Sequence, residues 1–274
     1  MEMIRRVLAR IGFYLLNVII GAFFLIPLLW LITAPFNPAG TLRVKIPRPF
    51  SLINFVKVFD NSFATHALIN SVIQAGGAMV GTVFIAALAA YVLSRVPFRG
   101  RDIAIYVLIL FSSVVSGTAA MVPIYLLTTA LRIVNTQIGV ILVLIGGLLP
   151  TAIFILRDFV DSLPRSYEES ALTSGAKHWQ MLRDIVLPLT RPGLAVIGVW
   201  AFVNVWGGFL IPFILLSDPQ KYPAAVAIYS YSTQFGPVLT LISTYSLLYA
   251  VPVIVLYLYV NRRYGFRFFG GIRG

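Results

Sequence analysis

The chain has 274 residues, of which 59% are hydrophobic and 11% are charged, with a formal net charge of +12 and no cysteine. Soluble domains usually carry about a quarter charged residues, and disordered chains have low hydrophobicity, so the composition excludes both classes. The absence of cysteine excludes disulfide scaffolds, thiolate zinc sites and thiol nucleophiles. The basic residues stand in short clusters between long apolar runs, so we expect no nucleic-acid partner, which would need them gathered on one face.

Six long uncharged runs predict an all-α membrane protein with six transmembrane helices, because roughly 20 consecutive apolar residues cross the hydrocarbon core as a helix. The runs are Ile11–Ala34, Ala67–Ser94, Ile103–Leu131, Ile133–Leu156, Pro192–Ser217 and Tyr222–Asn261. The last run is too long for one span and contains Gly236 and Pro237, so we expect an external loop and then a final helix over Leu241–Val260. The first run exceeds the about 7–15 apolar residues of a secretory signal, so we expect it to be retained as a span.

The basic residues predict that both termini lie in the cytoplasm, because short cytoplasmic loops retain an excess of Lys and Arg. With this orientation, fifteen of the 21 basic residues fall in cytoplasmic segments and six in external ones. The external ones are Arg43, Lys45, Arg48, Lys57, Arg132 and Lys221. Most of the positive charge is therefore a topology signal, and it favours contact with the anionic headgroups of the lipid bilayer.

The membrane runs contain no ionisable Asp, Glu or His, which argues against a proton-coupled carrier or pump. The two histidines, His66 and His178, lie outside these runs and far apart in the sequence, so we expect no catalytic residues and no metal site. The sequence has no glycine-rich phosphate loop that ends in Gly-Lys-Ser/Thr, so we expect no ATP and no other cofactor in this chain. Energy for transport would then have to come from a partner.

The longest predicted cytoplasmic segment, residues 157–191, has the pattern of two short helices joined by a glycine turn. Pro164 suits a first helical turn, and Ser166 with Glu169 forms a capping-box pattern. Gly175 suits the left-handed position that ends a helix. The first helix is acidic at its start and carries small side chains, so it could lie in a groove on another protein.

A second helix is expected over Lys177–Leu187, where Trp179, Leu182 and Val186 share a face at helical spacing and prolines follow. Each feature of the segment also has a purely local explanation. Glu169 can simply cap its own helix, the alanines can be ordinary helix formers, and the glycine can be an ordinary turn residue.

Taken together, these residues resemble the EAA loop of permease subunits in binding-protein-dependent ATP-binding-cassette importers. That loop reads Glu-Ala-Ala, two residues, Asp-Gly-Ala, and then an apolar-patterned helix that ends in Leu-Pro and a further proline. The matching residues here are Glu169-Ser170-Ala171, Gly175-Ala176, Trp179, Ile185, Leu187-Pro188 and Pro192.

The resemblance covers most of the chain and is closest to the carbohydrate branch, specifically the maltose-type second permease subunit. Supporting stretches are Ile69-Asn70-Ser71, Pro123-Ile124-Tyr125, Asn135-Thr136, Leu156-Arg157-Asp158-Phe159 and Gly270-Gly271-Ile272-Arg273-Gly274. Two departures are present. Ser174 replaces the usual aspartate before the glycine, and Gly207-Gly208 follow Trp206 where the sugar branch commonly has Asn and an acidic or polar residue.

The resemblance implies a type I ABC importer permease of the prokaryotic cytoplasmic (inner) membrane, with both termini inside. Three parts are then expected. Residues 1–66 hold the N-terminal cytoplasmic segment, the first span and an external loop; residues 67–261 form the core permease domain with five spans and the coupling loop 157–191; residues 262–274 form a cytoplasmic tail.

The implied partners are a homologous permease subunit in a heterodimer, two cytoplasmic ATPase subunits that bind ATP and Mg, and an extracytoplasmic solute-binding protein. The implied ATPase-coupling residues are Glu168, Glu169, Ala171, Ser174, Gly175 and Ala176. The external loop Ser217–Thr240 would contact the binding protein, and the tail segment Phe266–Gly274 would enter the ATPase dimer.

A pathway without ionisable side chains suits a neutral, hydroxyl-rich solute such as a carbohydrate. The candidate pathway residues are Ser112, Ser113, Ser116, Asn204 and Trp206. Small and hydroxylated residues also pack membrane helices against one another, so a structural role stays open for each. Two further functions stay open: import of a polyol phosphate such as glycerol phosphate, and a self-sufficient secondary carrier or channel.

Overall fold

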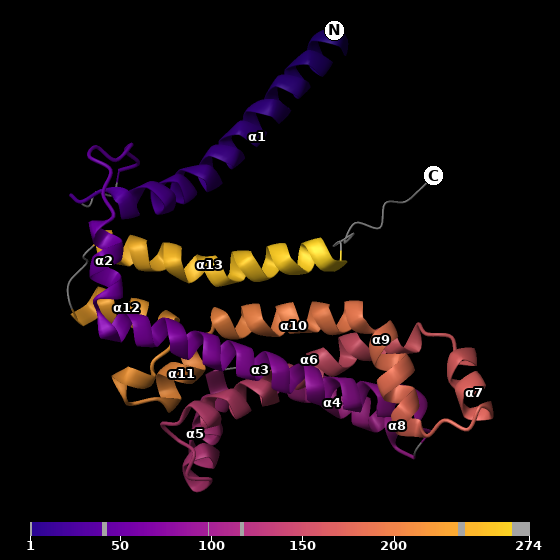
Figure 1. The fold of residues 1–274 in the computed structure, drawn as a ribbon. Helices are drawn as coiled ribbons and strands as arrows, with labels where there is room; N and C mark the ends of the chain where they lie inside the picture. The colour runs from indigo at the N-terminus through magenta and orange to yellow at the C-terminus, as the bar shows by residue number, and fades with distance from the viewer. Residues whose placement is uncertain (1, 40–42, 98, 116–117, 235–238, 265–274) are drawn as a thin grey trace. The chain divides into compact units, whose positions relative to one another are not determined.

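The computed structural model describes residues 2–39, 43–97, 99–115, 118–234 and 239–264, and over these residues every regular element is a helix (Figure 1). The α-helices are α1 Glu2–Thr33, α2 Ile53–Phe59, α3 Ser62–Arg95, α4 Arg101–Val115, α5 Met121–Ala130, α6 Gln137–Asp161, α7 Ser166–Thr173, α8 His178–Met181, α9 Leu187–Leu189, α10 Arg191–Trp206, α11 Leu210–Leu215, α12 Ala224–Gln234 and α13 Leu239–Tyr264. A π-helical segment, Leu182–Val186, joins α8 to α9. Ser116, Gly236, Pro237 and the tail segment Phe266–Gly274 lie outside the described residues.

The chain divides into two compact units. The first unit comprises Met1–Thr65 and Ile228–Val251, and the second comprises His66–Ala227 and Pro252–Gly274. The boundaries fall inside α3, α12 and α13, so these three helices contribute to both units.

The first unit contains α1, whose most apolar window has no residue buried in this chain. A helix that is apolar and uncovered by protein is suited to lipid. The segment that follows α1 is held by Asn54 of α2, which is 1% exposed. Its amide nitrogen donates to the carbonyls of Pro35 and Asn37 at 2.9 and 3.0 Å, so the buried amide is satisfied.

Four helices are long and apolar enough to cross a membrane: Arg10–Phe36, Ser62–Arg95, Gln137–Asp161 and Leu239–Arg263. A fifth candidate is a helix pair, Trp179–Leu189 and Arg191–Trp206, with a 73° bend between its members. The described part of the chain is thus an all-helical membrane protein with four to five candidate spans, compared with the six predicted from hydropathy.

The difference arises in the third and fifth apolar runs, which are broken. The third run, Ile103–Leu131, is divided between α4 and α5, and a 3-10 turn over Thr118–Ala120 precedes α5. The fifth run is divided between α10 and α11 at Gly207-Gly208, where the helix ends. Glycine has a low helix propensity, but Gly76-Gly77 and Gly146-Gly147 lie inside the continuous helices α3 and α6, so a glycine pair alone does not explain the break.

Small residues bring the helices of the second unit close together. One buried cluster joins Ala86, Ala87, Ala90 and Leu93 of α3 to Ala152, Ile153 and Leu156 of α6 and to Ile197 of α10. A Cβ atom at Gly81 of α3 would collide with the end of the Ile145 side chain of α6, so a larger residue here would require Ile145 to move. Close approach through small side chains is typical of helices that pack in a membrane.

Candidate functional site

The loop between α6 and α10 forms the predicted helix–turn–helix. α7 ends in a Schellman motif, in which the Gly175 amide donates to the Leu172 carbonyl at 2.9 Å and the Ala176 amide donates to the Ala171 carbonyl at 3.0 Å. Gly175 has a φ of +82°, which confirms the left-handed conformation predicted for it. No heavy atom would lie within 4 Å of a Cβ at this position, so the conformation alone selects glycine here.

The capping box predicted for α7 is wrong. The N-cap residue is Arg165, it has helical dihedral angles, and no side chain caps this helix. The Glu169 amide donates instead to the Arg165 carbonyl at 3.0 Å. The helix begins one residue earlier than the box requires, so Ser166 lies inside the first turn and its hydroxyl is not available as the N-cap acceptor.

The second helix of the loop is less regular than its sequence pattern predicts. Leu182 and Val186 are buried against Tyr91 and Val160, as their spacing predicts, but Trp179 is 59% exposed and does not share their face. The π-helical segment begins after α8, and the 3.6-residue period does not carry across this wider turn.

A side-chain contact caps the start of α8. The Lys177 amide donates to the Gln180 side-chain oxygen at 2.7 Å, which is one half of a capping box. The glutamine three residues after Lys177 is a sequence signal that could have identified this start.

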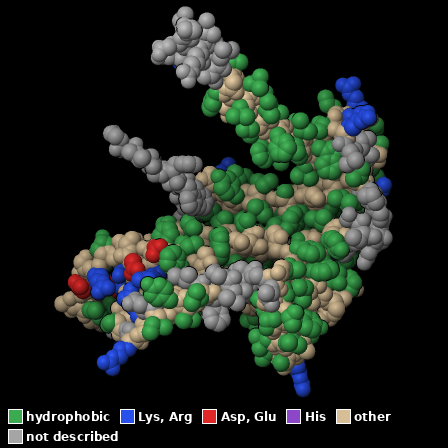
Figure 2. Space-filling view, turned by 180° about the vertical axis from the view of Figure 1, so that it is seen from behind, with side chains coloured by type: hydrophobic (Ala, Val, Ile, Leu, Met, Phe, Trp, Pro, Cys, Tyr) green, Lys and Arg blue, Asp and Glu red, His purple; other side chains and the backbone are tan. Residues whose placement is uncertain are grey.

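α7 is an exposed helix of the second unit. None of its residues is buried, and Tyr167 and Leu172 are 55% and 45% exposed. Trp179 adds a third large exposed side chain in the same loop. Figure 2 shows Asp and Glu side chains close to Lys and Arg side chains at the end of the second unit that carries α7 and α8. This combination of exposed aromatic, apolar and charged groups is typical of a protein-binding surface.

The six predicted coupling residues lie together on α7 and the turn after it. Glu168, Ala171 and Ala176 are half-buried, whereas Glu169, Ser174 and Gly175 are exposed. The Ser174 hydroxyl donates to the Ser170 carbonyl of its own helix at 2.9 Å. The serine that replaces the usual aspartate therefore fits the end of α7 without disturbing it.

Sequence reasoning missed Arg95, at the end of α3. Its Nε donates to Glu168 Oε1 at 2.6 Å, and its Nη2 donates to the carbonyls of Val160 and Leu163, each at 2.9 Å. The side chains of Arg95 and Glu168 are only 8% and 12% exposed. In the sequence Arg95 contributes to the topology signal, and its position directly after an uncharged run gave no further indication of a partner.

Two more polar side chains tie the same ends of α3 and α6 together. The Ser94 hydroxyl donates to Asp161 Oδ1, and Arg157 Nε lies 3.2 Å from Asp161 Oδ2 within α6. The ion pair between Arg157 and Asp161 is partly exposed, so its loss should cost little, whereas removal of one member of the buried pair of Arg95 and Glu168 would leave an unpaired buried charge.

At the opposite ends of α3 and α6, side chains hold the segment between α11 and α12. The side-chain oxygen of Asn135 accepts from the amides of Ser217 and Asp218 at 3.1 and 3.2 Å, and Lys221 Nζ donates to the Asn135 carbonyl at 3.0 Å. Asn135 has a φ of +56°, a conformation that asparagine adopts more readily than most residues.

The α3 side of this attachment uses two neighbouring residues. The Asn70 amide donates to the carbonyls of Gln220 and Tyr222 at 2.7 and 3.1 Å, and the Ser71 hydroxyl accepts from the Ala224 amide at 2.7 Å. Segment 217–224 is thus fixed from both sides.

The pathway candidates are placed only in part. Ser112 and Ser113 belong to α4, but their side chains are not among those that the structure describes. On α10, the Asn204 side chain is exposed and its amide donates to the Trp200 carbonyl at 2.8 Å. Trp206 is only 3% exposed and stacks on Phe202 with ring centroids 5.3 Å apart. A pathway role for these residues stays a prediction.

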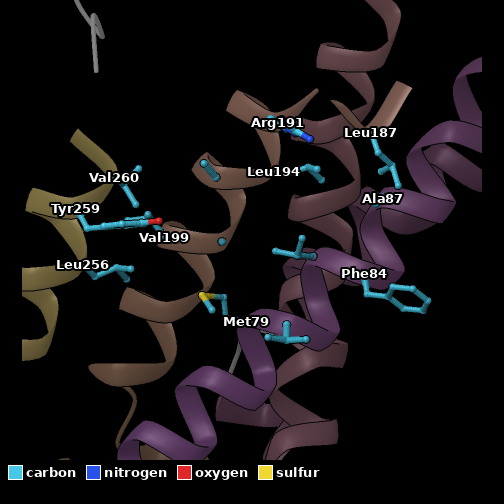
Figure 3. A pocket seen from close by; sticks show the side chains of 14 residues that line it. Met79, Phe84, Ala87, Leu187, Arg191, Leu194, Val199, Leu256, Tyr259 and Val260 are labelled. Atoms are coloured by element: carbon cyan, nitrogen blue, oxygen red, sulfur yellow. The ribbon is translucent and has the colours of Figure 1, made fainter. Parts of the chain in front are cut away.

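A hollow of about 570 Å³ lies in the second unit among α3, α10 and the last part of α13 (Figure 3). Its lining side chains are apolar except for Arg191 and Tyr259, and Figure 3 shows Tyr259 reaching from α13 toward Val199. Sugar sites need several convergent hydrogen-bonding groups. The lining of the hollow is too apolar to provide such groups, so its chemistry does not match a carbohydrate site. The hollow also contains none of the pathway candidates.

Residues 82–265 match the family described as "Binding-protein-dependent transport system inner membrane component". The chain is 30% identical over 251 residues to the diacetylchitobiose uptake system permease protein NgcG of Streptomyces coelicolor. The aligned region covers 87% of this chain and 80% of that protein. It is also 28% identical over 262 residues to the maltodextrin transport system permease protein MdxG of Bacillus subtilis, and this aligned region covers 94% of each protein.

A solved bacterial ABC transporter involved in the import of the acidic polysaccharide alginate has the same fold, with a TM-score of 0.81 at 21% identity. The likeness covers 94% of this chain and 97% of the solved one. The family match spans more than half of the chain and agrees with the resemblance of the α7 loop. The chain therefore belongs to the binding-protein-dependent ABC importer permeases: it is a multi-pass inner-membrane transport subunit and is not itself an enzyme.

Proposed function

We propose that this chain forms half of the translocation pathway of an ATP-driven carbohydrate importer, and that α7 couples it to a cytoplasmic ATPase subunit. The observation that carries the proposal is the exposure of α7, which has no buried residue yet presents Tyr167 and Leu172. Large exposed side chains on a short helix are expected where a partner covers them. Among the six coupling residues, Glu169 is the exposed acidic group of this surface.

The complete importer has three further kinds of subunit in this proposal. A homologous permease subunit forms the other half of the pathway, two ATPase subunits bind ATP and Mg, and an extracytoplasmic binding protein delivers the solute. ATP binding closes the ATPase dimer and moves the coupling helices, which opens the pathway to the outside, and hydrolysis resets it. A short helix held by a Schellman turn supports this role because it moves as a rigid body.

The topology that we propose has six spans and both termini in the cytoplasm. The third span runs through α4 and α5, and the fifth runs through α10 and α11. This arrangement places α7 and Arg95 inside and Asn135 outside, in agreement with the excess of Lys and Arg in the predicted cytoplasmic segments. The core domain 67–261, the coupling loop 157–191 and the tail 262–274 keep the boundaries that the sequence predicts.

We further propose that the external loop Ser217–Thr240 contacts the binding protein. Its first part, 217–224, is fixed by Asn70, Ser71 and Asn135. A loop that is already fixed loses little conformational entropy when a partner binds it, so the cost of binding is lower.

The proposed substrate is a neutral oligosaccharide. Curated relatives of this chain include permeases named for diacetylchitobiose, galactooligosaccharides, maltodextrin and trehalose. The absence of ionisable side chains from the apolar runs agrees with a neutral solute. The polyol-phosphate alternative has no specific support in the structure, and membership of a binding-protein-dependent family removes the self-sufficient carrier.

The test is reconstitution of the transporter in proteoliposomes with its binding protein. An ATPase should co-purify with the tagged permease, and uptake of labelled maltodextrin or diacetylchitobiose should require both ATP and the binding protein. Uptake of glycerol phosphate in preference to every sugar would contradict the proposed substrate class. Uptake without any ATPase would contradict the coupling role.

A further inference from the structure

The two adjacent glutamates of α7 have different surroundings. Glu168 is 12% exposed at its side chain and accepts a hydrogen bond from Arg95, whereas Glu169 is exposed. Neighbouring residues on an α-helix point about 100° apart, because one turn takes about 3.6 residues. One glutamate can therefore face the membrane helices while the other faces a partner.

Arg95 joins three segments through one guanidinium group. Its Nε bonds to Glu168 on α7, and its Nη2 bonds to the carbonyl of Val160 in α6 and to that of Leu163 just after α6. The last carbonyls of a helix lack their usual donors within the helix, and Arg95 adds donors at this point. The Val160 carbonyl also accepts from the Leu163 amide at 3.1 Å, so the guanidinium is its second donor. The planar guanidinium holds these donors at fixed angles, which the single ammonium group of lysine cannot do.

α7 has few other attachments. Among the described residues, Glu168 supplies the only side-chain hydrogen bond between α7 and another helix, and the main helix neighbour of α7 is α8. Pro164 and Gly175 flank it. Without the bond from Arg95, α7 would be held to the membrane helices mainly by its two connecting turns.

We propose that Arg95 is a positioning residue that fixes α7 to the end of α3, so that α3 moves when a partner displaces α7. This inference rests on the proposed function, because it takes α7 as the helix that an ATPase displaces. α3 packs tightly on α6 and α10 through Ala86, Ala90 and their neighbours. A displacement at its end is therefore passed on to the packed membrane helices, because closely packed interiors deform little.

The experiment uses the absence of cysteine from this chain, since spin labels then attach to it only at introduced positions, and any cysteines of the partner subunits are first replaced. Thr173→Cys on α7 and Val92→Cys on α3 replace two exposed side chains, and their distance distribution is measured in the complete transporter. We expect one narrow distribution in the otherwise unmodified complex. Arg95→Gln should broaden it and lower solute uptake per ATP hydrolysed about tenfold while the ATPase stays bound, because removing one member of a buried pair leaves the other unpaired. Arg95→Lys should give an intermediate result, because it keeps the charge but not the geometry.

Arg157→Gln is the matched control. It removes an arginine at the same end of the second unit, but its ion pair is with Asp161 of its own helix α6 and not with α7. The control should keep both the narrow distribution and the uptake ratio. If Arg95→Gln is not recovered from membranes, Glu168→Ala replaces it, because it frees α7 while Arg95 can still bond to the carbonyls of Val160 and Leu163.

The two proposals fail in different ways. If the unmodified permease binds no ATPase, the proposed function fails. If the ATPase is bound but Arg95→Gln or Glu168→Ala leaves the distance distribution and the uptake ratio unchanged, the role of Arg95 fails and the proposed function stands.

Discussion

Gln74 of α3 and Gln137 at the start of α6 are joined by a hydrogen bond of 2.7 Å between Nε2 and Oε1 of their side chains. Gln74 is 1% exposed, so this bond satisfies a buried polar group. The amide of Gln137 then donates to the Lys221 carbonyl at 3.0 Å. The two glutamines therefore connect the packed helices to segment 217–224, which we propose as the base of the binding-protein contact.

Gln74→Leu should lower the free energy of unfolding of the permease by about 1–3 kcal/mol, because the oxygen of Gln137 loses its buried donor. Unfolding by SDS titration in detergent micelles measures this change. A double variant, Gln74→Leu with Gln137→Leu, should lose less than the sum of the two single variants, because both partners are then apolar. Strict additivity would show that the bond does not couple the two positions.

Gly175→Ala should destabilise the turn after α7 by about 1–2 kcal/mol, because an alanine resists a positive φ. Surrounding space is open, so a clash does not contribute. We expect weaker ATPase co-purification and lower uptake, with Gly175→Val worse than Gly175→Ala, because a β-branched residue resists the left-handed region more strongly.

Gly175→Asn is the control for this position, since asparagine accepts the left-handed conformation. It should retain the ATPase at close to the unmodified level. Equal defects in the alanine and asparagine variants would mean that the glycine is required for a reason other than its φ.

The features that the sequence predicted well are local ones. Gly175 was predicted because the left-handed end of a helix is set by the residues within one turn. The long apolar helices α1, α3, α6 and α13 were predicted because each lies in an unbroken apolar run. The family followed from the order of residues in one loop, which does not depend on knowing the packing.

The features that escaped prediction depend on distant parts of the chain or on exact helix register. Arg95 and Glu168 are 73 residues apart, and no spacing rule connects them. Trp179 was placed on the wrong face because hydropathy periods assume an unbroken α-helix, whereas a π segment follows α8. The breaks between α4 and α5 and at Gly207 are invisible to a search for uncharged runs, because they change backbone geometry without adding charge.

Topology can be tested with reporter fusions at Asn61, Arg99 and Ser174. The charge distribution predicts alkaline phosphatase activity, which requires an external location, at Asn61 and none at the other two sites. An external signal from Ser174 would place α7 on the wrong side of the membrane for an ATPase, and the coupling proposal would then be abandoned.

Glu169→Lys tests the proposed polar contact between α7 and the ATPase. The variant should insert normally and keep its stability, because α7 has no side-chain cap and Glu169 is exposed. Its only intrinsic loss is the favourable interaction of a carboxylate with the start of the helix dipole, typically about 0.3–1 kcal/mol. By contrast, breaking a buried charge pair across an interface typically costs about 2–5 kcal/mol.

These magnitudes separate the two explanations of Glu169. If it contacts the ATPase, the lysine variant should release the ATPase on purification or hydrolyse ATP without uptake, and reversal of the facing basic residue on the ATPase should restore part of the uptake. If it serves only its own helix, thermal unfolding shifts slightly and assembly is unchanged. Glu169→Gln should lie between the unmodified protein and Glu169→Lys, because it removes the attraction without adding repulsion. Detergent-purified Glu169→Lys complexes that keep both their ATPase and ligand-stimulated hydrolysis would show that another group on α7 makes the contact.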